Sequence, residues 1–524
     1  MSTGVQETYN DEKAAVVDDR PIGGDVAKRT HVVALQGLYE DGAIDAVYQR
    51  KAQILNQAIQ EIGMGRYQYL LFITAGFGWF ADSVWPLLTG LILTPVVAEF
   101  GFTPSYLTLA ANIGLLVGAA FWGFGCDVFG TWAFNLTLLI TGAFGLAAGG
   151  SDRFITLASL LAVVGVGVGG NMPVDSALFL DLVPGTHQYL LTVMTVFWSL
   201  GQLFASMIAW PLIANFSCSS STTASACTRA NNMGWRYLLF TLGGTTLVLW
   251  AVRFFAFRMF ESPRYLVGKG RDVEAVKVIH DIARYNGKEA TLTVEELAGV
   301  RAKGDEEKGG ASGLVDGERK AHEPVLTRTS VFRMEHMRGL FATPKIALST
   351  SLLVVLWGLI GLASTLYNSF LPFILQNRGN VYGDGSLYTT YRNNAILAVI
   401  GIPAAFLAGY LVELPRVGRK GTLALFSCTS GQLLGWNCGY TFSSNIMYGV
   451  LYAISPEIFP AKDRGTGNAL VSTTTRVFGV VAPVIALFAD ITTAVPVYVS
   501  GAIIIACGGI ALLLPYEPRG KASI

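Results

Sequence analysis

Charged residues are scarce in this sequence. Of its 524 residues, 37 are Lys or Arg and 36 are Asp or Glu, so that 14% are charged, against about 25% in an average soluble protein. The two signs nearly cancel, which leaves no basic excess of the kind that nucleic-acid binding requires. A chain that is 52% hydrophobic is also too apolar to be disordered. An ordinary soluble enzyme, a disordered protein and a nucleic-acid binder are therefore excluded.

The few charges are concentrated in two segments. Residues 1–66 carry 17 of them and residues 258–345 carry 30, whereas the other 370 residues carry only 26, or about 7%. A folded soluble surface needs more polar groups than that. We therefore expect the low-charge part of the chain to lie in a lipid bilayer. No secretory signal is expected before it, because residues 1–66 are polar.

Groups that hold metals or carry out catalysis are also sparse. The five histidines are scattered outside the apolar segments, and the sequence shows no nucleophile–base pair or cluster of metal ligands. Residues 165–170 match the nucleotide-binding pattern G-x-G-x-x-G, but no strand precedes them. Glycines spaced through an apolar helix indicate close helix packing or bending instead. We expect no enzyme, no cofactor and no metal site.

Apolar segments long enough to cross a bilayer, which takes roughly 20 residues, occur on both sides of the polar insert. Six precede it and six follow it, which predicts an all-α membrane protein of twelve spans in two six-helix bundles. The expected spans are 69–97, 106–124, 133–150, 154–180, 190–214, 235–257, 343–375, 391–412, 421–438, 443–458, 466–488 and 494–514. The corresponding regions are a tail at 1–66, a bundle at 67–257, a loop at 258–342, a bundle at 343–516 and a tail at 517–524.

The loop between the bundles contains one helical pattern. Between residues 272 and 286, apolar side chains recur at helical spacing at Val273, Val276, Ile279 and Ile282, and Gly287 follows as a stop. We expect an amphipathic helix at 272–286 that lies against the inner ends of the bundles.

The distribution of Lys and Arg predicts the orientation, since cytoplasmic loops carry an excess of both. With both termini and the long loop in the cytoplasm, 31 of the 37 basic residues lie inside or at the inner ends of spans. The Ser- and Thr-rich loop between Cys218 and Cys227 is then outside, where a disulfide can persist. We expect this pair to be either a disulfide or two free thiols.

The ninth span is shorter than its counterpart in the first half. The interval from Gly418 to Glu457 has 39 residues, 12 fewer than the interval from Gly130 to Asp181. Two spans of about 20 residues and a turn need more than that. Either span nine is truncated, or the sequence lacks part of it.

Acidic residues recur at corresponding places in the two halves. Asp127 follows the second span and Glu413 the eighth, while Asp181 ends the fourth span and Glu457 the tenth. Two six-helix bundles related in this way are the architecture of a transporter that rocks about a central site.

Several motifs resemble those of a known family. They are Ala81-Asp82-Ser83 in span one, Gly169-Gly170-Asn171-Met172-Pro173-Val174-Asp175 in span four, Glu261-Ser262-Pro263-Arg264-Tyr265-Leu266 after span six, and Pro456-Glu457-Ile458-Phe459-Pro460 after span ten. Over residues 67–520 the chain resembles a sugar-porter-type member of the major facilitator superfamily, nearest to fungal transporters related to synaptic vesicle glycoproteins. The resemblance implies a double bundle that works by alternating access, with spans one and eleven lining a central cavity.

The chain departs from the family pattern around Asp82. Leu161 stands where many relatives carry an Arg in span four, and Trp85 stands where an acidic residue often follows Asp82. Thr131 and Trp132 replace basic residues after the first acidic motif. The usual scheme of proton coupling therefore does not carry over directly.

The candidate site for solute and protons combines an acid, a base, amides and aromatic rings. Asp82 would accept a proton or bind the solute, unless a backbone carbonyl or a buried Ser or Thr holds it neutral. Arg476 is the only basic residue expected deep in a span, and it could meet Asp82 through solute or water. The other candidates are Asn171, Asp175, Trp198, Gln202, Tyr367 and Asn368. Each of these could equally serve helix packing, and Asp175, toward the cytoplasmic end of its span, could instead have a gating or boundary role.

A second set of candidates lies at the cytoplasmic ends of the spans. It comprises Gly123, Asp127, Gly130, Asp181, Glu261, Arg264, Glu413, Gly418, Arg419, Glu457 and Arg464. Ion pairs among the charged members would hold the bundles together while the outside is open, and would break for inward opening. The alternative is that these residues only mark the membrane boundary.

These features together predict a secondary transporter. We expect a plasma-membrane protein, functional as a monomer, that carries a small organic solute such as a sugar or an organic acid together with protons. Proton-driven efflux of a metabolite or toxin is one alternative, since motifs do not fix direction. A sensor that binds without transport is another, although only about ten residues follow span twelve.

Overall fold

Helices make up the regular structure of the part of the chain that this computed structural model describes. The described residues are 46–129, 131–218, 227–299, 340–341, 343–368, 387–412, 422, 433–459, 464–488 and 495–515. No strand occurs among them, which confirms the all-α class. Eight of their helices are long and apolar enough to cross a bilayer, and two shorter apolar helices accompany them.

The helices of the first half follow the expected spans closely. Their bounds are α3 Arg66–Leu91, α4 Leu93–Phe100, α5 Ser105–Phe129, α6 Thr131–Ala148, α7 Phe154–Leu182, α8 Leu190–Val193, α9 Thr195–Phe216 and α10 Gly234–Ala251. The first expected span is divided at Ile92, and the sixth ends in a π-helical turn, Val252–Ala256.

The helices of the second half differ from expectation at one place. Their bounds are α15 Pro344–Asn368, α17 Leu387–Val412, α19 Leu433–Ile458, α20 Arg464–Phe488 and α21 Val495–Leu512. Most of expected span nine lies outside the described residues. The expected break between spans nine and ten, at 439–442, is wrong, because α19 runs through it. No proline precedes Pro456 in this segment, so that backbone hydrogen bonding continues from Leu433.

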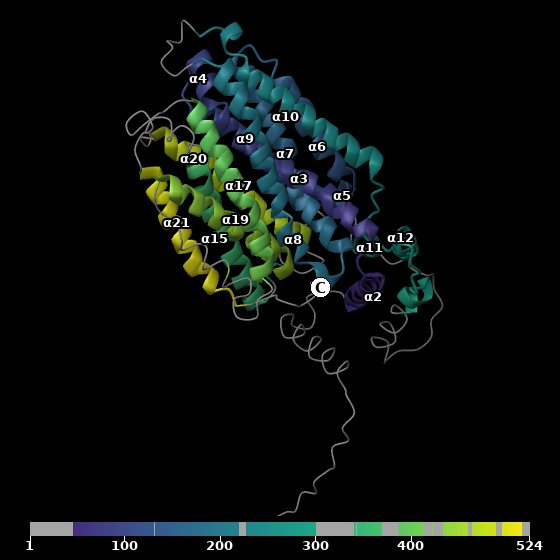
Figure 1. The fold of residues 1–524 in the computed structure, drawn as a ribbon. Helices are drawn as coiled ribbons and strands as arrows, with labels where there is room; N and C mark the ends of the chain where they lie inside the picture. The colour runs from purple at the N-terminus through teal and green to yellow at the C-terminus, as the bar shows by residue number, and fades with distance from the viewer. Residues whose placement is uncertain are drawn as a thin grey trace, which may run out of the picture. The chain divides into compact units, whose positions relative to one another are not determined.

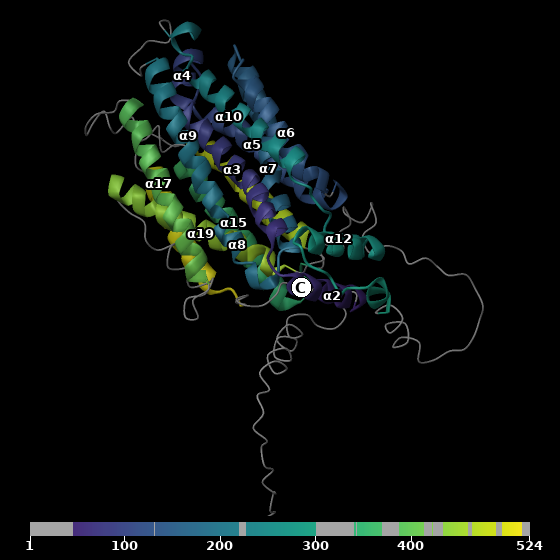
Figure 2. The same cartoon turned by 45° about the vertical axis from the view of Figure 1, so that its right-hand side comes forward.

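The two halves pack against each other along several helices. Helix α20 lies against α5, and α17 lies against α9. Figures 1 and 2 show α3 to α10 in purple and teal and α15 to α21 in green and yellow, with α3 and α7 near the centre of the first group. A site between the halves can therefore use side chains from both.

Glycines let α7 approach its neighbours closely. A Cβ atom added at Gly165 would lie 2.7 Å from the carbonyl oxygen of Ala111 in α5, and one added at Gly169 would lie 2.4 Å from that of Leu115. These distances are shorter than any van der Waals contact, so larger residues would force the helices apart. The expectation that these glycines serve packing is confirmed.

Three shorter helices outside the spans pack together. Helix α12, Asp272–Tyr285, matches the expected amphipathic helix and packs against α11, Pro263–Gly268, and α2, Ala46–Ile62. Of its expected apolar face Val273 is 65% exposed, so that residue was assigned wrongly. Sequence reasoning missed α2, whose buried Tyr48, Ala52, Leu55, Ile59 and Ile62 recur at helical spacing.

Candidate functional site: a cavity between the two halves

A cavity of about 180 Å³ lies between the helices of the two halves. Both halves contribute to its wall, with α3, α5 and α9 on one side and α15, α17, α19 and α20 on the other. Its polar and aromatic lining includes Trp79, Ser83, Asn112, Trp198, Gln202, Asn368, Asn394, Tyr440, Asn445, Tyr448, Tyr452, Thr475 and Arg476. Apolar walls with a few convergent polar groups are typical of small-molecule sites.

Arg476 in α20 and Asp82 in α3 form an ion pair across the two halves. Arg476 Nη2 donates to Asp82 Oδ2 over 3.4 Å. The Asp82 side chain is 1% exposed and that of Arg476 is 16% exposed. Arg476 lines the cavity, whereas Asp82 is not among the lining residues. The basic partner that Asp82 lacks in span four is thus supplied from span eleven.

Aromatic rings from both halves form one part of the wall. The rings of Trp198 in α9 and Tyr448 in α19 are 15° from parallel, with centroids 6.2 Å apart. Tyr452, one turn further along α19, contacts Trp79 of α3 edge-on at 5.0 Å and Trp357 of α15 at 4.5 Å. These contacts join the bundles through rings that a planar solute could also face.

A smaller cavity of about 30 Å³ adjoins the first. Tyr452, Thr475 and Arg476 line both cavities, and Met172, Ser176 and Ser455 are among the residues that line only the smaller one. Tyr452 and Arg476 therefore lie where the two spaces meet.

Amide and hydroxyl groups lie in and next to the wall. Ser199 in α9 donates to Asn445 Oδ1 in α19 over 3.1 Å, which links the halves. The Nδ2 group of Asn394 is buried and has no hydrogen-bond partner among the described residues. A solute acceptor could satisfy such a donor, because an unpaired buried amide is costly.

A second buried ion pair lies within the first half. Asp175 in α7 binds Arg253, which the π-helical turn after α10 directs inward, and both side chains are fully buried. A Cβ atom at Gly78 would lie 1.7 Å from Asp175 Oδ2, so Gly78 leaves the space that this carboxylate occupies against α3. Besides Arg476, a second arginine is therefore buried within the bundle, in the last turn of span six.

The predicted solute-site residues divide into two groups. Trp198, Gln202, Asn368 and Arg476 line the cavity. The other four do not belong to its lining.

Each of those four has another place. Asp82 pairs with Arg476, and Asp175 pairs with Arg253. Asn171 is fully buried and its side-chain amide has no hydrogen-bond partner among the described residues. Tyr367 is buried against the ring of Tyr440, with centroids 4.0 Å apart.

The structure also brings in residues that sequence reasoning missed. Asn445, Tyr448 and Tyr452 are spaced three and four residues apart and share one face of α19. This polar and aromatic face in a predicted span was the signal that could have found them.

The candidate cytoplasmic gate is described only in part. Arg264 Nη1 donates to Asp181 Oδ1 over 3.2 Å, Ser262 Oγ donates to Asp181 Oδ2 over 2.6 Å, and Arg264 also binds Asn56 of α2. These contacts join α7, in the first half, to α11 and α2, which lie outside the spans, and Glu261 immediately precedes Ser262. Gly130, Glu413, Gly418 and Arg419 lie outside the described residues, and only the backbone is described for Gly123, Asp127, Glu457 and Arg464.

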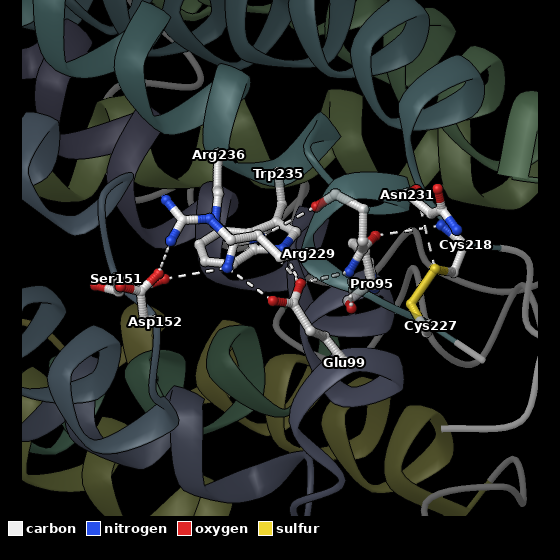
Figure 3. Close-up of polar contacts among 11 residues, drawn as sticks. Pro95, Glu99, Ser151, Asp152, Cys218, Cys227, Arg229, Asn231, Trp235 and Arg236 are labelled. Atoms are coloured by element: carbon white, nitrogen blue, oxygen red, sulfur yellow. Dashed lines mark hydrogen bonds and ion pairs between the residues drawn. A yellow bond between two sulfur atoms is a disulfide. The ribbon is translucent and has the colours of Figure 1, made fainter. Parts of the chain in front are cut away.

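The opposite ends of the helices carry a buried carboxylate network (Figure 3). Glu99 of α4 accepts hydrogen bonds from Arg236 Nη2 at 2.7 Å and Nη1 at 3.0 Å, from Trp235 Nε1 at 3.0 Å and from Asn232 Nδ2 at 2.9 Å. Burial alone would raise the pKa of the Glu99 carboxyl, but the bonds from these donors hold it below its ordinary value.

A disulfide joins Cys218 and Cys227, with Cα atoms 6.0 Å apart. The backbone N–H of Cys218 donates to Asn232 Oδ1 over 3.2 Å. The disulfide is therefore tied to the Glu99 network through Asn232; Figure 3 shows Cys218, Cys227 and Glu99 in one view.

Comparison with known proteins identifies the family. The family model "Sugar (and other) transporter" matches residues 101–335. A relative named MFS siderochrome iron transporter 1, from Ceriporiopsis subvermispora, is 64% identical over 93% of this chain and 94% of its own length. The niacin transporter NiaP of Acinetobacter baylyi is 26% identical, over 82% of this chain and 88% of its own.

More distant similarities agree with these. The synaptic vesicle 2-related protein of Rattus norvegicus is 25% identical, over 90% of this chain and 82% of its own. The solved structure of the proton:xylose symporter XylE shares the fold, with a TM-score of 0.63 and 15% identity, over 87% of this chain and 98% of the other.

Proposed function

The chain belongs to the major facilitator superfamily of membrane transporters, in its sugar-porter-like branch, and from this premise we propose that it is a proton-coupled symporter of a small organic solute. The observation that carries the proposal is the Asp82–Arg476 pair at a cavity built from both halves. A titratable acid buried within a bundle of apolar helices is costly, and in transporters it commonly serves proton transfer.

Contacts between the halves support alternating access. The Ser199–Asn445 hydrogen bond, the Trp198–Tyr448 stack and the Trp79–Tyr452 contact each join a helix of the first half to α19. Rocking of one half against the other would break such contacts on one side of the cavity and keep them on the other. The Asp82–Arg476 pair is a charged contact between the halves, from α3 to α20, so protonation of Asp82 would change how strongly the halves are held together.

The cavity size favours a small solute. Pockets for drug-sized ligands have volumes of about 300–1,000 Å³, and this cavity has about 180 Å³. Niacin, which the name of one relative gives as its solute, is a single-ring acid and suits the smaller volume. An iron-bound siderochrome, which the name of the 64%-identical relative indicates, is much larger. It is the second candidate solute, and would require the cavity to open widely.

Orientation and location complete the proposal. Both termini and the loop at 258–342 lie in the cytoplasm, as the excess of Lys and Arg there favours. The protein acts as a monomer in the plasma membrane, and each monomer carries its own cavity.

Uptake by the purified full chain in lipid vesicles tests the function. Vesicles would receive labelled xylose, nicotinate, carnitine or a ferric siderochrome, with the outside at pH 6.0 and the inside at pH 7.5. We expect one of these solutes to accumulate above its outside concentration, and to equilibrate without accumulating when the pH gradient is abolished. Accumulation that is indifferent to the pH gradient would contradict proton coupling, and uptake of none of the panel by folded protein would contradict the transporter proposed.

A further inference from the structure

The wall of the central cavity is electropositive. Among the described residues that line it, Arg476 is the one with a formal charge, because the other polar lining groups are amides, hydroxyls, phenols and indoles. Asp82, the acid of the pair, does not belong to the lining and is almost fully buried. A solute that enters the cavity therefore meets a positive charge before a negative one, and an anion is favoured over a cation.

Arg476 has hydrogen-bonding capacity to spare. A guanidinium carries five N–H donors, and in the described part of the chain Asp82 is its one hydrogen-bond partner, at 3.4 Å. A contact of that length is weak beside the 2.7–2.9 Å of a good charge-assisted bond. A solute carboxylate could therefore displace Asp82 from Arg476 and make two bonds where the protein makes one.

Charge balance sets a condition on that exchange. The Asp82–Arg476 pair is neutral as a whole. An anion alone would leave the site with one net negative charge, and a proton alone would leave it with one net positive charge, each costly in a buried site. When a proton binds Asp82 and an anion binds Arg476, the site is neutral again.

From these observations we propose that the solute is a small organic monocarboxylate that takes the place of Asp82 on Arg476 while Asp82 holds the co-transported proton. One proton and one anion then bind and leave together, and the loaded and empty sites have the same net charge. This inference rests on the proposed symport function and specifies its solute and its stoichiometry.

The aromatic wall adds a preference for a planar ring. Trp198 and Tyr448 present nearly parallel ring faces from opposite halves. A flat solute whose carboxylate is held by Arg476 could stack on these rings, which a saturated ring of the same size could not do as well.

None of the other described groups named here competes with Asp82 as the proton acceptor. Helix α19 contributes Tyr452, and α7 contributes Asp175, which is already bound by Arg253. Helix α20 contributes Arg476 itself, and α9 contributes the uncharged side chains of Trp198 and Gln202 to the same cavity. Of the two carboxylates, Asp82 is therefore the one that a solute can displace from its arginine.

A matched pair of probes tests the class of solute. Nicotinate and nicotinamide share one ring and differ by a carboxylate against a neutral amide. In the vesicle assay with the outside at pH 6.0, we expect saturable uptake of nicotinate and less than about a tenth of that rate for nicotinamide, since a charge-assisted pair contributes tenfold or more. The initial rate should not change when the membrane potential is set with potassium and valinomycin, because the cycle moves no net charge.

Three variants test the residues. Arg476→Gln should raise the KM for nicotinate about 10- to 100-fold, whereas Arg229→Gln, which removes the same charge at an exposed loop, should not. Asp82→Asn should still exchange nicotinate between the two sides of the vesicle, but should not accumulate it in response to a pH gradient. The double variant Asp82→Asn/Arg476→Gln leaves the site neutral and serves as the control for folding.

The outcomes separate this inference from the function on which it rests. Gradient-driven uptake of nicotinamide, xylose or siderochrome in preference to nicotinate would be consistent with a symporter, but would overturn the proposal that the solute is a small monocarboxylate. A nicotinate rate that follows the membrane potential would overturn the one-to-one exchange. Normal nicotinate kinetics in a folded Arg476→Gln protein would remove Arg476 as the binding group.

Discussion

The Glu99–Arg236 network allows a sharp prediction about stability. Glu99→Gln keeps the shape of the side chain and removes its charge. It leaves Arg236, which is 1% exposed, without a counter-charge, and turns an amide N–H toward groups that also donate. Removing one partner of a buried ion pair costs about 3–5 kcal/mol. Four donors, each losing about 1 kcal/mol when its acceptor becomes neutral, give a similar figure.

The neighbouring pair of Asp152 and Arg229 provides a matched control, visible in the same view (Figure 3). Its side chains are 63% and 56% exposed, and exposed pairs contribute only about 0–1 kcal/mol. Asp152→Asn should therefore change stability little. Both variants remove one acidic charge from neighbouring positions, so that the difference between them isolates burial.

The assay is the apparent Tm of the purified protein in detergent, followed by intrinsic fluorescence at a fixed heating rate, since membrane proteins often unfold irreversibly. We expect Glu99→Gln to lower it by several degrees and Asp152→Asn to leave it nearly unchanged. The network also predicts a pH dependence. The pKa of Glu99 is lowered by folding, so its stabilising effect is present above its ordinary value of 4.5 and is lost as the pH falls below that value.

Loss of this acid sensitivity in Glu99→Gln would support the assignment. Equal melting temperatures for Glu99→Gln and Asp152→Asn, at neutral pH, would refute the reasoning, because the buried carboxylate would then contribute no more than an exposed one.

Other perturbations have equally definite outcomes. Asp175→Asn should destabilise the protein by about 3–5 kcal/mol, because it leaves Arg253 buried and unpaired. In thermal melts, the double variant Asp175→Leu/Arg253→Met should recover most of that loss. A double variant no more stable than Asp175→Asn would argue against a stabilising ion pair. Gly169→Val should force α7 away from α5 and lower the stability of the protein by at least about 1–3 kcal/mol. The measurement is the loss of monodisperse protein in size-exclusion chromatography. A normal elution profile and a normal Tm would contradict the close packing of the two helices. Reduction of the disulfide between Cys218 and Cys227, or its replacement by two serines, should lower the apparent Tm by an amount that corresponds to about 2–4 kcal/mol. An unchanged Tm under reducing conditions would show that the disulfide does not contribute to stability.

The class of protein followed from features that are local in the sequence. A membrane span needs only a run of apolar residues, so the first six spans agree with the helices to within a few residues. The role of the α7 glycines in helix packing could also be predicted, because small residues in an apolar helix are typical of close helix–helix contacts. Short motifs carried the family resemblance, and the relatives agree with it.

Helix boundaries were less certain where no sequence signal marked them. The start of α19 was placed ten residues late, because a polar stretch at 439–445 resembles a loop but is helical. Helix α2 was hidden in a polar tail, although its buried face repeats at helical spacing. In both cases the deciding contacts are tertiary, since packing against other helices stabilises the helix.

The sequence by itself determined that this chain is a helical membrane transporter, because the bilayer acts on each span separately through its hydrophobicity. It also supplied Asp82 and Arg476 as unusual charges in apolar surroundings. Only the tertiary structure decided which charges meet: Arg476 with Asp82, 394 residues apart, and Arg253 with Asp175, 78 residues apart. Ion pairing is a matter of distances of a few ångströms, and those distances depend on how helices remote in sequence are packed.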